Sequence, residues 1–460
     1  MSTQVDVVVI GMGVGGGGVA EDLAEAGLDV VGIDRGLVGG ECPYWGCIPT
    51  KMMIRASNAL AEARRVGELS GTSTVEPDWS PVAARIRDEA TDDWDDRVAV
   101  ERFEGKGGRF VRGAGRLDGP GRVAVDGDVF EAGRGIVVAT GTRAAAPPIP
   151  GLDGVDYWTN REAVEAKELP ESLLVLGGGA IGLELSQVFA RFGVRVTIVE
   201  GAPRLLAPEE PESSELIAEV FGREGIEVHV GANVEAARTD DGRAVLTLAG
   251  DDGATSELTA DRLLVATGRR ANLAAVGAGS VGLDEGARGI PVDDHLRVPG
   301  VERLWGVGDV TGVGAFTHVA VYQGRIATAD ILGENPVPAD YRALPRVTFT
   351  DPEVGSVGAS EAKAREDGIS VRVGSAPASA STRGWIHKAG NDGFIKLVED
   401  ADRGYLVGAT SVGPVGGEVL GMLTLAVNER VPTPHLRQMI YAYPTFHRGI
   451  EDALRDLADG

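Results

Sequence analysis

The chain has 460 residues, which is too long for a single hydrophobic core and predicts two to four domains. Its content of 43% hydrophobic and 25% charged residues is typical of a soluble globular protein. The formal net charge of -25 argues against nucleic acid or an anionic membrane as a general partner. No apolar run approaches the roughly 18 to 20 residues that span a bilayer, so we expect a cytoplasmic protein without membrane attachment.

The N-terminal stretch predicts a strand, a glycine-rich turn, a helix and a second strand. The expected bounds are residues 5–10 for the first strand, 17–26 for the helix and 29–33 for the second strand. Between the first strand and the helix, GMGVGG places Gly11, Gly13 and Gly16 in a GxGxxG pattern, and Asp34 follows the second strand. Such glycines allow a close backbone approach, the helix N-terminus offers N–H groups to a pyrophosphate, and the acid accepts from a ribose hydroxyl. We therefore expect a dinucleotide site here.

A second copy of this pattern predicts a second dinucleotide site. Its expected bounds are residues 172–176 for the first strand, 183–192 for the helix and 195–199 for the second strand. The turn GGGAIG contributes Gly177, Gly179 and Gly182, and Glu200 stands where Asp34 stands in the first copy. A single GxGxxG is weak support, but two copies in full strand-turn-helix context favour two sites.

Two further stretches resemble each other and end in Ala-Thr-Gly. Residues 136–143 and 263–270 each combine a buried-type strand with this ending, and the simplest interpretation is that each closes its own nucleotide domain. We place Thr140, Gly141 and Gly268 of these stretches among the cofactor-binding residues. Further on, Asp309 follows a predicted strand over residues 304–307, at the kind of strand end where parallel sheets bind ligands.

Beyond about residue 344 the glycine pattern stops, and the rest of the chain predicts an α+β domain. Antiparallel strands are expected within residues 347–358, 393–398 and 405–413, and helices over residues 416–427 and 434–440. This portion needs a role other than nucleotide binding, such as subunit association.

The only two cysteines, Cys42 and Cys47, lie in the stretch GGECPYWGCIPTK. In the cytoplasm such a close pair favours redox activity or metal binding over a structural disulfide. Zinc would need further ligands from distant parts of the chain, while inert buried thiols remain an alternative. Gly40 and its neighbours indicate a close backbone approach, and we count Gly40 among the cofactor-binding residues. A helix beginning near Pro49 would place Cys47 at its N-terminus, which favours a thiolate.

Taken together, these motifs resemble the FAD-dependent pyridine nucleotide-disulfide oxidoreductases, the family of dihydrolipoamide dehydrogenase, glutathione reductase and mercuric reductase. The resemblance covers essentially the whole chain and is carried, in family order, by GMGVGG, GGECPYWGCIPTK, VVATGT, GGGAIGLE, ATGRRANL, GVGDVTG and the final YPT. It implies an α/β fold with two Rossmann-like dinucleotide-binding domains and a C-terminal α+β dimerisation domain. The implied bounds are residues 1–150 for the FAD-binding domain, 151–272 for the NAD(P)-binding domain, 273–340 for a return to the FAD domain and 341–460 for the dimerisation domain.

The resemblance also implies the cofactors. FAD would occupy the first site, with Asp309 on the ribityl chain of the flavin, and a nicotinamide dinucleotide would occupy the second. Glu200 favours NADH, because a carboxylate accepts from a 2′-hydroxyl and repels a 2′-phosphate. Arg204 is close enough in sequence to serve a phosphate instead, which keeps NADPH possible.

The catalytic roles follow from the same resemblance. Cys42 would be the interchange thiol that attacks the substrate, and Cys47 the thiol next to the flavin. Lys51 matches the lysine near the flavin N5 and Glu184 the acid that pairs with it, although such a pair can also be a surface ion pair of little energy. The family is usually a homodimer in which the C-terminal domain of one subunit completes the active site of the other.

The chain departs from the family near its C-terminus. A histidine normally stands before Pro-Thr as the proton carrier, with a glutamate a few residues later, but here Tyr443 and Arg448 occupy these positions. Tyrosine, with an ordinary pKa of about 10, is a poor base at neutral pH. On a helix His447 would lie one turn from Tyr443 and could take over, but Pro444 makes the helix start uncertain, and a surface or packing histidine is the alternative.

We therefore expect a flavoenzyme that passes electrons from NAD(P)H through FAD to a Cys42–Cys47 disulfide and on to a small disulfide-type substrate. The alternative is a diaphorase-like reductase of a quinone, a dye or a metal ion, for which no histidine base is needed. A third hypothesis is a flavoprotein without turnover that serves as a binding or redox-sensing subunit. A tyrosine near the C-terminus resembles mercuric reductase, but the chain lacks that enzyme's additional cysteines, which argues against mercury.

Overall fold

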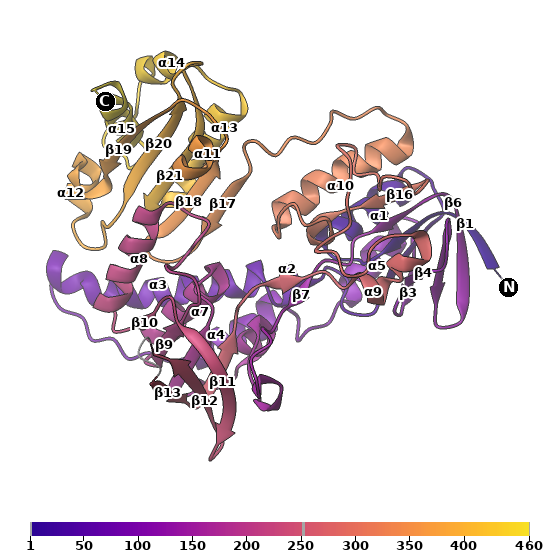
Figure 1. Ribbon diagram of the computed structural model, residues 1–460, viewed down its shortest axis with the longest axis horizontal. Coiled ribbons are helices and arrows are strands. Elements are labelled where there is room, and N and C mark those ends of the chain that lie inside the picture. Colours follow the sequence, from indigo (N-terminus) through magenta and orange to yellow (C-terminus); the bar gives the residue numbers. More distant parts are fainter. Residues whose placement is uncertain (1, 251–253, 460) are drawn as a thin grey trace. The chain divides into compact units, whose positions relative to one another are not determined.

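The computed structural model describes residues 2–250 and 254–459 and divides the chain into two compact units. Unit 1 comprises Met1–Thr50, Ala83–Ala145 and Gly268–Asp340, and unit 2 comprises Lys51–Val82, Ala146–Thr267 and Tyr341–Gly460. Figure 1 follows the chain through both units. Across the described residues, no helix combines the length and the apolar character needed to cross a bilayer.

Unit 1 is built on a mixed sheet whose central strands are parallel. The parallel strands run in the order β3-β2-β1-β6, and the last residues of β6 pair in parallel with β16 while its first residues pair antiparallel with β5. The strands are β1 (Ser2–Ile10), β2 (Val30–Asp34), β3 (Arg109–Arg112), β4 (Arg116–Leu117), β5 (Arg122–Val125), β6 (Asp128–Val138) and β16 (Leu304–Gly306). The central strands are valine- and isoleucine-rich because a parallel sheet is covered on both faces.

Helices cover one face of this sheet closely. Helices α1 (Val14–Glu25) and α10 (Thr317–Leu332) pack against each other, and a side chain at Gly15 would lie 3.1 Å from Cβ of Ala320. The remaining elements of unit 1 are α2 (Glu41–Tyr44), α5 (Arg97–Gly105), α9 (Leu273–Val276), the π-helix η1 (Ile86–Ala90), the 3₁₀ helices η3 (Ala278–Val281) and η4 (Gly308–Thr311), and the paired strands β7 (Arg143–Ala144) and β15 (Arg269–Arg270). Helices α3 (Cys47–Leu69) and α4 (Ser80–Arg85) each begin in one unit and end in the other.

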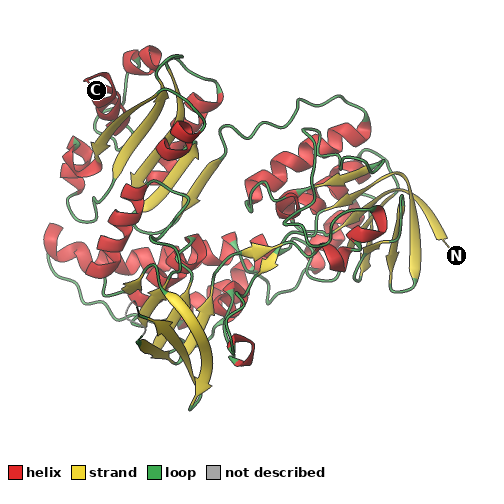
Figure 2. Cartoon of the chain, in the orientation of Figure 1, coloured by secondary structure: helices red, strands yellow, loops and turns green. Residues whose placement is uncertain are grey.

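Unit 2 begins with a second parallel sheet, of order β10-β9-β8-β14. Its strands are β8 (Ser172–Leu176), β9 (Arg195–Val199), β10 (Glu227–His229) and β14 (Arg262–Val265), with helices α6 (Asn160–Glu165), α7 (Ala180–Arg191) and α8 (Pro211–Arg223) and the 3₁₀ helix η2 (Leu152–Gly154). An antiparallel layer of β11 (Asn233–Asp240), β12 (Arg243–Ala249) and β13 (Thr255–Ala260) shares a core with this sheet, and its long strands are yellow in Figure 2.

The C-terminal part of unit 2 is an antiparallel sheet of order β17-β18-β21-β20-β19. Its elements are β17 (Pro345–Thr348), β18 (Glu353–Gly358), β19 (Val371–Pro377), β20 (Phe394–Asp400), β21 (Tyr405–Gly413), α11 (Glu361–Glu366), η5 (Ala378–Ala380), α12 (Thr382–His387), α13 (Gly416–Asn428), α14 (Thr433–Gln438) and α15 (Gly449–Asp459). Helices α13 and α15 pack on this sheet around one apolar core, and Figure 1 shows both beside it. The predicted change from α/β to α+β is therefore confirmed.

The expected helices begin three residues earlier than predicted. Helix α1 starts at Val14 rather than residue 17, and α7 starts at Ala180 rather than residue 183. The physical reason is that Gly13 and Gly179 are themselves the N-cap residues, so the second half of each glycine motif already forms the first helical turn.

Candidate active site

The first glycine loop has a backbone that only glycine accommodates. Gly11 has a φ of +97°, and a Cβ at this position would lie 2.4 Å from the carbonyl oxygen of Ala139. A Cβ on Gly16 would lie 2.0 Å from the carbonyl oxygen of Gly11. The N-cap Gly13 has no side-chain cap, and the first turn of α1 holds no acidic residue. The N–H groups of this helix end are thus suited to an anion such as a pyrophosphate.

Asp34 supports the same loop from the end of β2. Its carboxylate accepts from the backbone N–H of Met12 at 2.7 Å and from that of Gly36 at 2.8 Å. A carboxylate has about four acceptor positions, so two backbone bonds leave capacity for a ribose hydroxyl.

The second glycine loop repeats this geometry. Gly177 has a φ of +116°, and a Cβ there would lie 2.5 Å from the carbonyl oxygen of Ala266. A Cβ on Gly182 would lie 2.1 Å from the carbonyl oxygen of Gly177, whereas one on Gly179 would meet nothing within 4 Å. The side of Gly179 that a cofactor would approach is therefore open.

The two Ala-Thr-Gly stretches supply the alanines that contact the first glycine of each loop. Strand β6 pairs with β1 and strand β14 pairs with β8, so Ala139 and Ala266 each pack against the first glycine of their own loop. Thr140 is exposed beside the first loop, Gly268 is exposed, and Gly141 is half-buried with a φ of +62°. The first stretch follows β6, which pairs with both β1 and β16, and the second follows β14 at the edge of its sheet.

Glu200 and Arg204 differ in the hydrogen-bonding capacity that they leave for a nucleotide. The Glu200 carboxylate accepts from the N–H groups of Gly178 and Ala202, in the manner of Asp34. The Arg204 guanidinium donates to the carbonyl oxygens of Leu206 and Ala207 and to Ser214 Oγ. Arg204 thus holds its own loop together, a role that its spacing from Glu200 did not indicate.

The cysteine stretch is tied to the first glycine loop. The Gly39 N–H donates to the carbonyl oxygen of Met12 at 2.7 Å, and a Cβ on Gly40 would lie 2.9 Å from Cα of Gly13. Both residues have positive φ, +110° and +69°. The close approach predicted from these glycines is therefore, in this structure, an approach of Gly40 to the backbone of Gly13.

Cys42 and Cys47 are unbridged thiols in this structure, Cys42 half-buried in α2 and Cys47 exposed as the first residue of α3. A hydrogen bond with Cys47, followed by burial, raises the pKa of the Cys42 thiol far above its ordinary value. The Cys47 sulfur also lies 3.4 Å from the hydroxyl of Thr317, the first residue of α10. Sequence reasoning missed Thr317, because a hydroxyl 270 positions away carries no spacing signal.

Asp309 lies in a small polar network after β16. Its carboxylate accepts from Thr142 Oγ1 at 2.9 Å, and Arg269 donates to the same hydroxyl at 2.9 Å and to the Thr142 carbonyl oxygen at 2.8 Å. Burial is the largest effect on Asp309 and raises the pKa of its carboxyl group, against the opposing effects of Thr142 and Arg269. Neither Thr142 nor Arg269 was singled out from the sequence, although both stand in the Ala-Thr-Gly stretches.

Lys51 and Glu184 form an ion pair of 2.7 Å. The Glu184 side chain is only 7% exposed and that of Lys51 is 35% exposed. The carboxylate of this pair is therefore buried, while its ammonium is partly exposed to solvent.

The C-terminal segment places Tyr443 and His447 in different surroundings. Tyr443 is 65% exposed and its hydroxyl lies 3.3 Å from Thr382 Oγ1, while the Arg448 guanidinium covers its ring at 5.4 Å. His447 is half-buried against Thr445 and the ring of Tyr441. Helix α15 begins only at Gly449, so the helical spacing that would place His447 one turn from Tyr443 is not formed.

A cavity of ≈ 690 Å³ lies beside this segment, within unit 2. Pro444, Phe446 and His447 border it, together with Val415 and Val419 of the α13 end. Charged side chains also reach it, from Arg65, Asp351, Arg383 and Glu418. Its wall is thus partly apolar and partly charged.

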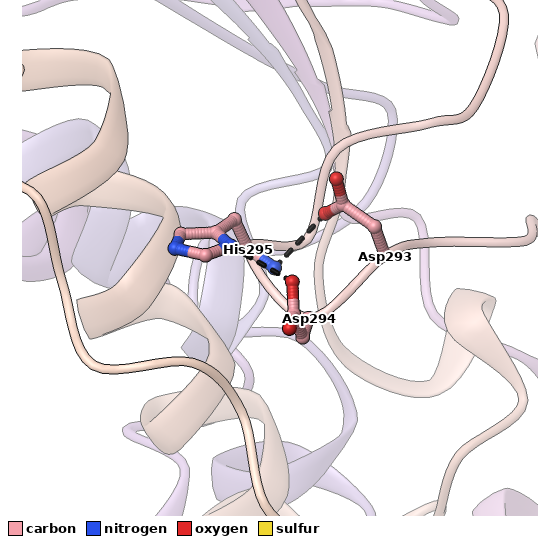
Figure 3. Close-up of side chains that lie close together, drawn as sticks. All are labelled: Asp293, Asp294 and His295. Atoms are coloured by element: carbon pink, nitrogen blue, oxygen red, sulfur yellow. Dashed lines mark hydrogen bonds and ion pairs between the residues drawn. The ribbon is translucent and has the colours of Figure 1, made fainter.

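Asp293, Asp294 and His295 form an exposed group in which three ligand-type atoms lie within 4.8 Å of one another. Figure 3 shows the contacts: Asp293 accepts from the His295 backbone N–H at 2.9 Å, and the His295 ring lies 2.8 Å from Asp294. Asp293 also accepts from the Arg297 N–H at 2.9 Å, so its carboxylate stabilises a local turn. We assign no metal site to these residues.

Two dinucleotide-type loops and a cysteine pair tied to the first of them define a two-nucleotide reductase with a redox dithiol. Sequence comparison agrees with this class: the pattern described as pyridine nucleotide-disulphide oxidoreductase matches residues 5–324, and the dimerisation domain of the same family matches residues 344–454. The chain belongs to the pyridine nucleotide-disulphide oxidoreductase family. FAD and a pyridine nucleotide are typical of this family, and the chain is an enzyme of its disulfide reductase type.

Similar proteins carry more than one named activity. The chain is 33% identical to a dihydrolipoyl dehydrogenase of Zymomonas mobilis over 99% of this chain and 98% of that protein. It is 34% identical to a mercuric reductase of Streptomyces lividans, over 98% of this chain and 95% of that protein. The names of these relatives therefore do not decide which electron acceptor this chain reduces.

Solved structures match over the full length as well. The Cu(II) complex of the HOCl-induced flavoprotein disulfide reductase RclA from Escherichia coli superposes with a TM-score of 0.86 at 25% identity, covering 98% of this chain and 99% of that one. LpdA from Mycobacterium tuberculosis superposes with a TM-score of 0.85 at 26% identity, covering 98% and 100%. The predicted fold class is confirmed by these matches.

Proposed function

We propose that the protein is an NADH-dependent flavoenzyme that passes two electrons through FAD to a Cys42–Cys47 disulfide and on to a small disulfide-type substrate. The observation that carries this proposal is the pair of thiols joined by a hydrogen bond and held, through Gly39 and Gly40, against the first glycine loop. A cysteine pair with only a structural role would not need this attachment to a cofactor-type loop.

The first loop suits FAD. Gly11, Gly13 and Gly16 with the α1 N-terminus would hold the pyrophosphate, and Asp34 would accept from the adenosine ribose. Asp309 would hold the ribityl chain, and we keep Gly40, Thr140 and Gly141 among the lining residues. When bound, FAD supplies the centre that takes a hydride from the nicotinamide and delivers two electrons to the disulfide. We also propose the domain bounds given above, residues 1–150, 151–272, 273–340 and 341–460.

The second loop suits NADH better than NADPH. Gly177, Gly179 and Gly182 would take the pyrophosphate, with Gly268 beside them. Glu200 presents a carboxylate where a 2′-phosphate would have to lie. The guanidinium of Arg204 already donates to two carbonyl oxygens of its own loop and to the hydroxyl of Ser214 on α8. We expect Glu200→Gln to lower the preference for NADH over NADPH about tenfold, which corresponds to roughly 1.4 kcal/mol of discrimination. Equal discrimination in the variant and the wild type would argue against this assignment.

The disulfide chemistry uses the two thiols in turn. After two electrons and two protons have converted the disulfide to a dithiol, the Cys42 thiolate attacks one sulfur of the substrate disulfide and releases the first substrate thiol. Cys47 then attacks the Cys42 sulfur, which restores the enzyme disulfide and releases the second substrate thiol. The sum is one NADH and one proton consumed for each disulfide reduced to two thiols.

Proton transfer at Cys42 is where this chain departs from its family. Because the Cys42 pKa is raised in the dithiol, a partner must take its proton before it attacks. We assign Tyr443 to the position of the usual histidine, with its hydroxyl as a hydrogen-bonding group and the neighbouring Arg448 as a positive charge over the ring. His447 is the second candidate. Tyr441 is not one, because burial raises its pKa to about 12.

A second candidate function is reduction of a quinone, a dye or a metal ion by the same flavin. The apolar side of the cavity beside Pro444 and Phe446 favours a flat apolar acceptor such as a quinone over a charged disulfide. Such an acceptor would also need no base at position 443.

The dimerisation domain suggests a homodimer. Large apolar side chains on this domain support it, since Trp385 is 75% exposed and Ile440 is 96% exposed. We further propose a cytoplasmic protein, because the only two cysteines of the chain form the redox pair and none is left for a structural disulfide.

The decisive experiment is anaerobic reduction of the FAD-loaded enzyme with NADH. We expect a long-wavelength absorbance band from the Cys47 thiolate beside the flavin, which should disappear in Cys47→Ser but persist in Cys42→Ser. A wild-type enzyme without this band would contradict disulfide chemistry. Rates with lipoamide, glutathione and mycothiol disulfides, compared with rates for quinones, then separate the two candidate functions.

Position 443 is tested separately. If Tyr443 occupies the base position, Tyr443→His should increase the disulfide reductase rate, by up to about 10²-fold given what general acid–base catalysis contributes. The matched variant His447→Gln should change little. A loss of disulfide reductase rate in His447→Gln, with no gain in Tyr443→His, would assign the base to His447 instead.

A further inference from the structure

Glu184 has both carboxylate oxygens occupied by different partners. Oε2 accepts from the Lys51 ammonium at 2.7 Å, and Oε1 accepts from the backbone N–H of Phe349 at 2.8 Å. The residue is 6% exposed, so both bonds form away from bulk water, where hydrogen bonds to a charged group are strong. The orientation of this carboxylate is thus set by the segment that follows β17 as well as by Lys51.

Phe349 also contacts the other member of the pair. The Lys51 ammonium lies over the Phe349 ring, 4.5 Å from its centroid, within the range of a cation–π interaction. A lysine ammonium sits on a flexible four-carbon stem and has no fixed donor geometry of its own. The ring therefore restricts a side chain that would otherwise move freely around Glu184.

The segment that carries Phe349 is held by the same face of α7. Gln187, one turn after Glu184, accepts from the Asp351 N–H at 2.7 Å and donates to the Asp351 carbonyl oxygen at 2.9 Å. One turn further, Arg191 donates to the Asp351 carboxylate at 2.8 Å. Since Gln187 and Arg191 are each 3% exposed, these are buried contacts that leave Phe349 little freedom.

We propose that Phe349 is a positioning residue for the Lys51–Glu184 pair. Its N–H fixes the carboxylate and its ring fixes the ammonium, so the charge of Lys51 is held at one place before a cofactor binds. A charge held in place costs no rearrangement during the reaction, which is how fixed groups favour charge developing nearby. This inference rests on the proposed function and on the expectation, drawn from the family resemblance, that Lys51 is the lysine near the flavin N5.

The test removes the ring and keeps the backbone. Phe349→Leu and the more conservative Phe349→Met are compared with Phe349→Tyr, which keeps an aromatic face under the ammonium. Phe110→Leu is the matched control, because the Phe110 ring also lies under a cation, the Arg112 guanidinium at 4.6 Å, on strand β3 of the other unit. Lys51→Met and Glu184→Gln show what is lost when the ion pair itself is removed.

Three quantities are measured on the FAD-loaded proteins: the single-turnover rate of reduction by NADH, the pH midpoint of the long-wavelength band and the melting temperature. We expect Phe349→Leu and Phe349→Met to slow reduction about threefold to thirtyfold, the range of a partly desolvated cation–π contact, and to raise the pH midpoint of the band. Phe349→Tyr should retain the wild-type rate and midpoint, and Phe110→Leu should leave both unchanged.

Two results would overturn the inference. If Lys51→Met and Glu184→Gln alter the rate and the band but both ring-removing variants of Phe349 behave as wild type or lose only thermal stability, Phe349 is a packing residue and the role of the pair stands. If Lys51→Met and Glu184→Gln leave the rate and the band unchanged, the proposed function of the pair fails, and the positioning role fails with it.

Discussion

The two glycine loops are nearly identical in geometry, but the structures around them differ. In both, the first glycine has a positive φ and meets the carbonyl oxygen of an alanine, and the third meets the carbonyl oxygen of the first. In both, an acidic residue at the end of the next strand accepts from a loop N–H. The two loops therefore share one local backbone geometry.

The sheets beside the loops are extended differently. In unit 1 a further parallel strand, β16, pairs with β6 and brings Asp309 to the end of the sheet, whereas in the described part of unit 2 the parallel order ends at β14. The helices differ as well. The buried face of α1 is made of glycines and small apolar residues, while α7 buries Glu184, Gln187 and Arg191 against the segment around Asp351. The geometry of each short loop is determined by nearby residues. The side chains that surround each loop come from segments distant in the sequence.

The largest effect on cofactor binding should come from filling the third glycine of either loop. Because a Cβ there would lie 2.0 Å from a carbonyl oxygen in Gly16→Ala and 2.1 Å in Gly182→Ala, the loop must move in both variants. We expect Gly16→Ala to lose FAD affinity tenfold or more, about 1.4 kcal/mol or more, and Gly182→Ala to keep FAD but lose reduction by NADH to a similar extent. Flavin absorbance per chain and NADH titration check the pair. Loss of both cofactors in both variants would show that the two folds are not independent.

The buried polar face of α7 should give the largest effect on stability. Arg191→Met removes a buried cation from the carboxylates of Glu224 and Asp351. Because Asp351 keeps its ion pair with Arg65, we expect a loss of about 3 kcal/mol in the free energy of unfolding, the lower end of the range for breaking a buried pair. The matched variant Arg97→Met, which breaks an exposed pair with Glu101, should cost no more than about 0.5 kcal/mol. Urea unfolding of the full chain distinguishes them, and equal losses would mean that the α7 contacts contribute as little as a surface pair.

Asp309 should make the first fold sensitive to pH in the absence of FAD. Its carboxyl pKa is raised by burial, so the folded protein binds this proton more tightly than the unfolded chain, and the resulting stability is present at low pH and lost as pH rises through the raised pKa. Asp309→Asn should therefore raise the melting temperature of the apoprotein at pH 7 by about 2 to 4 °C, equivalent to roughly 1 kcal/mol, while weakening FAD binding. The gain should shrink toward pH 4, and a gain that grows as pH falls would contradict the sign.

The smallest effect is expected at a glycine that has no neighbour. Gly18 lies in α1, and a Cβ at this position would meet nothing within 4 Å, so Gly18→Ala should stabilise the protein by about 0.5 to 1 kcal/mol through helix propensity. Flavin content should remain that of the wild type. A loss of flavin would mean that α1 is constrained along its exposed side as well.

The sequence was sufficient for the parts that short-range chemistry determines. The strands predicted over residues 172–176 and 195–199 coincide with β8 and β9, and the glycine positions could be assigned because only one residue type tolerates those contacts. Thr317, Arg269 and Phe349 could not be found in this way. Each contacts its partner across a long sequence separation. Phe349 acts partly through its backbone N–H, which every residue except proline has, so neither composition nor spacing indicates it.

The C-terminal segment shows a different limit. That Tyr443 stands before Pro-Thr can be read from the sequence, but its surroundings depend on where the chain turns after it. Helix α15 starts two residues after His447, so the helical spacing from Tyr443, which Pro444 already left open, does not apply.

The sparse cysteine content has a practical consequence. With one half-buried and one exposed thiol and no other cysteine in the chain, alkylation of the denatured protein can add two labels to the reduced form and none to the oxidised form. The mass of the intact chain therefore reports the oxidation state of the Cys42–Cys47 pair directly, without digestion or peptide assignment. A population caught in the middle of turnover would appear as a third mass, enlarged by whatever thiol is joined to Cys42, and that increment would identify the acceptor.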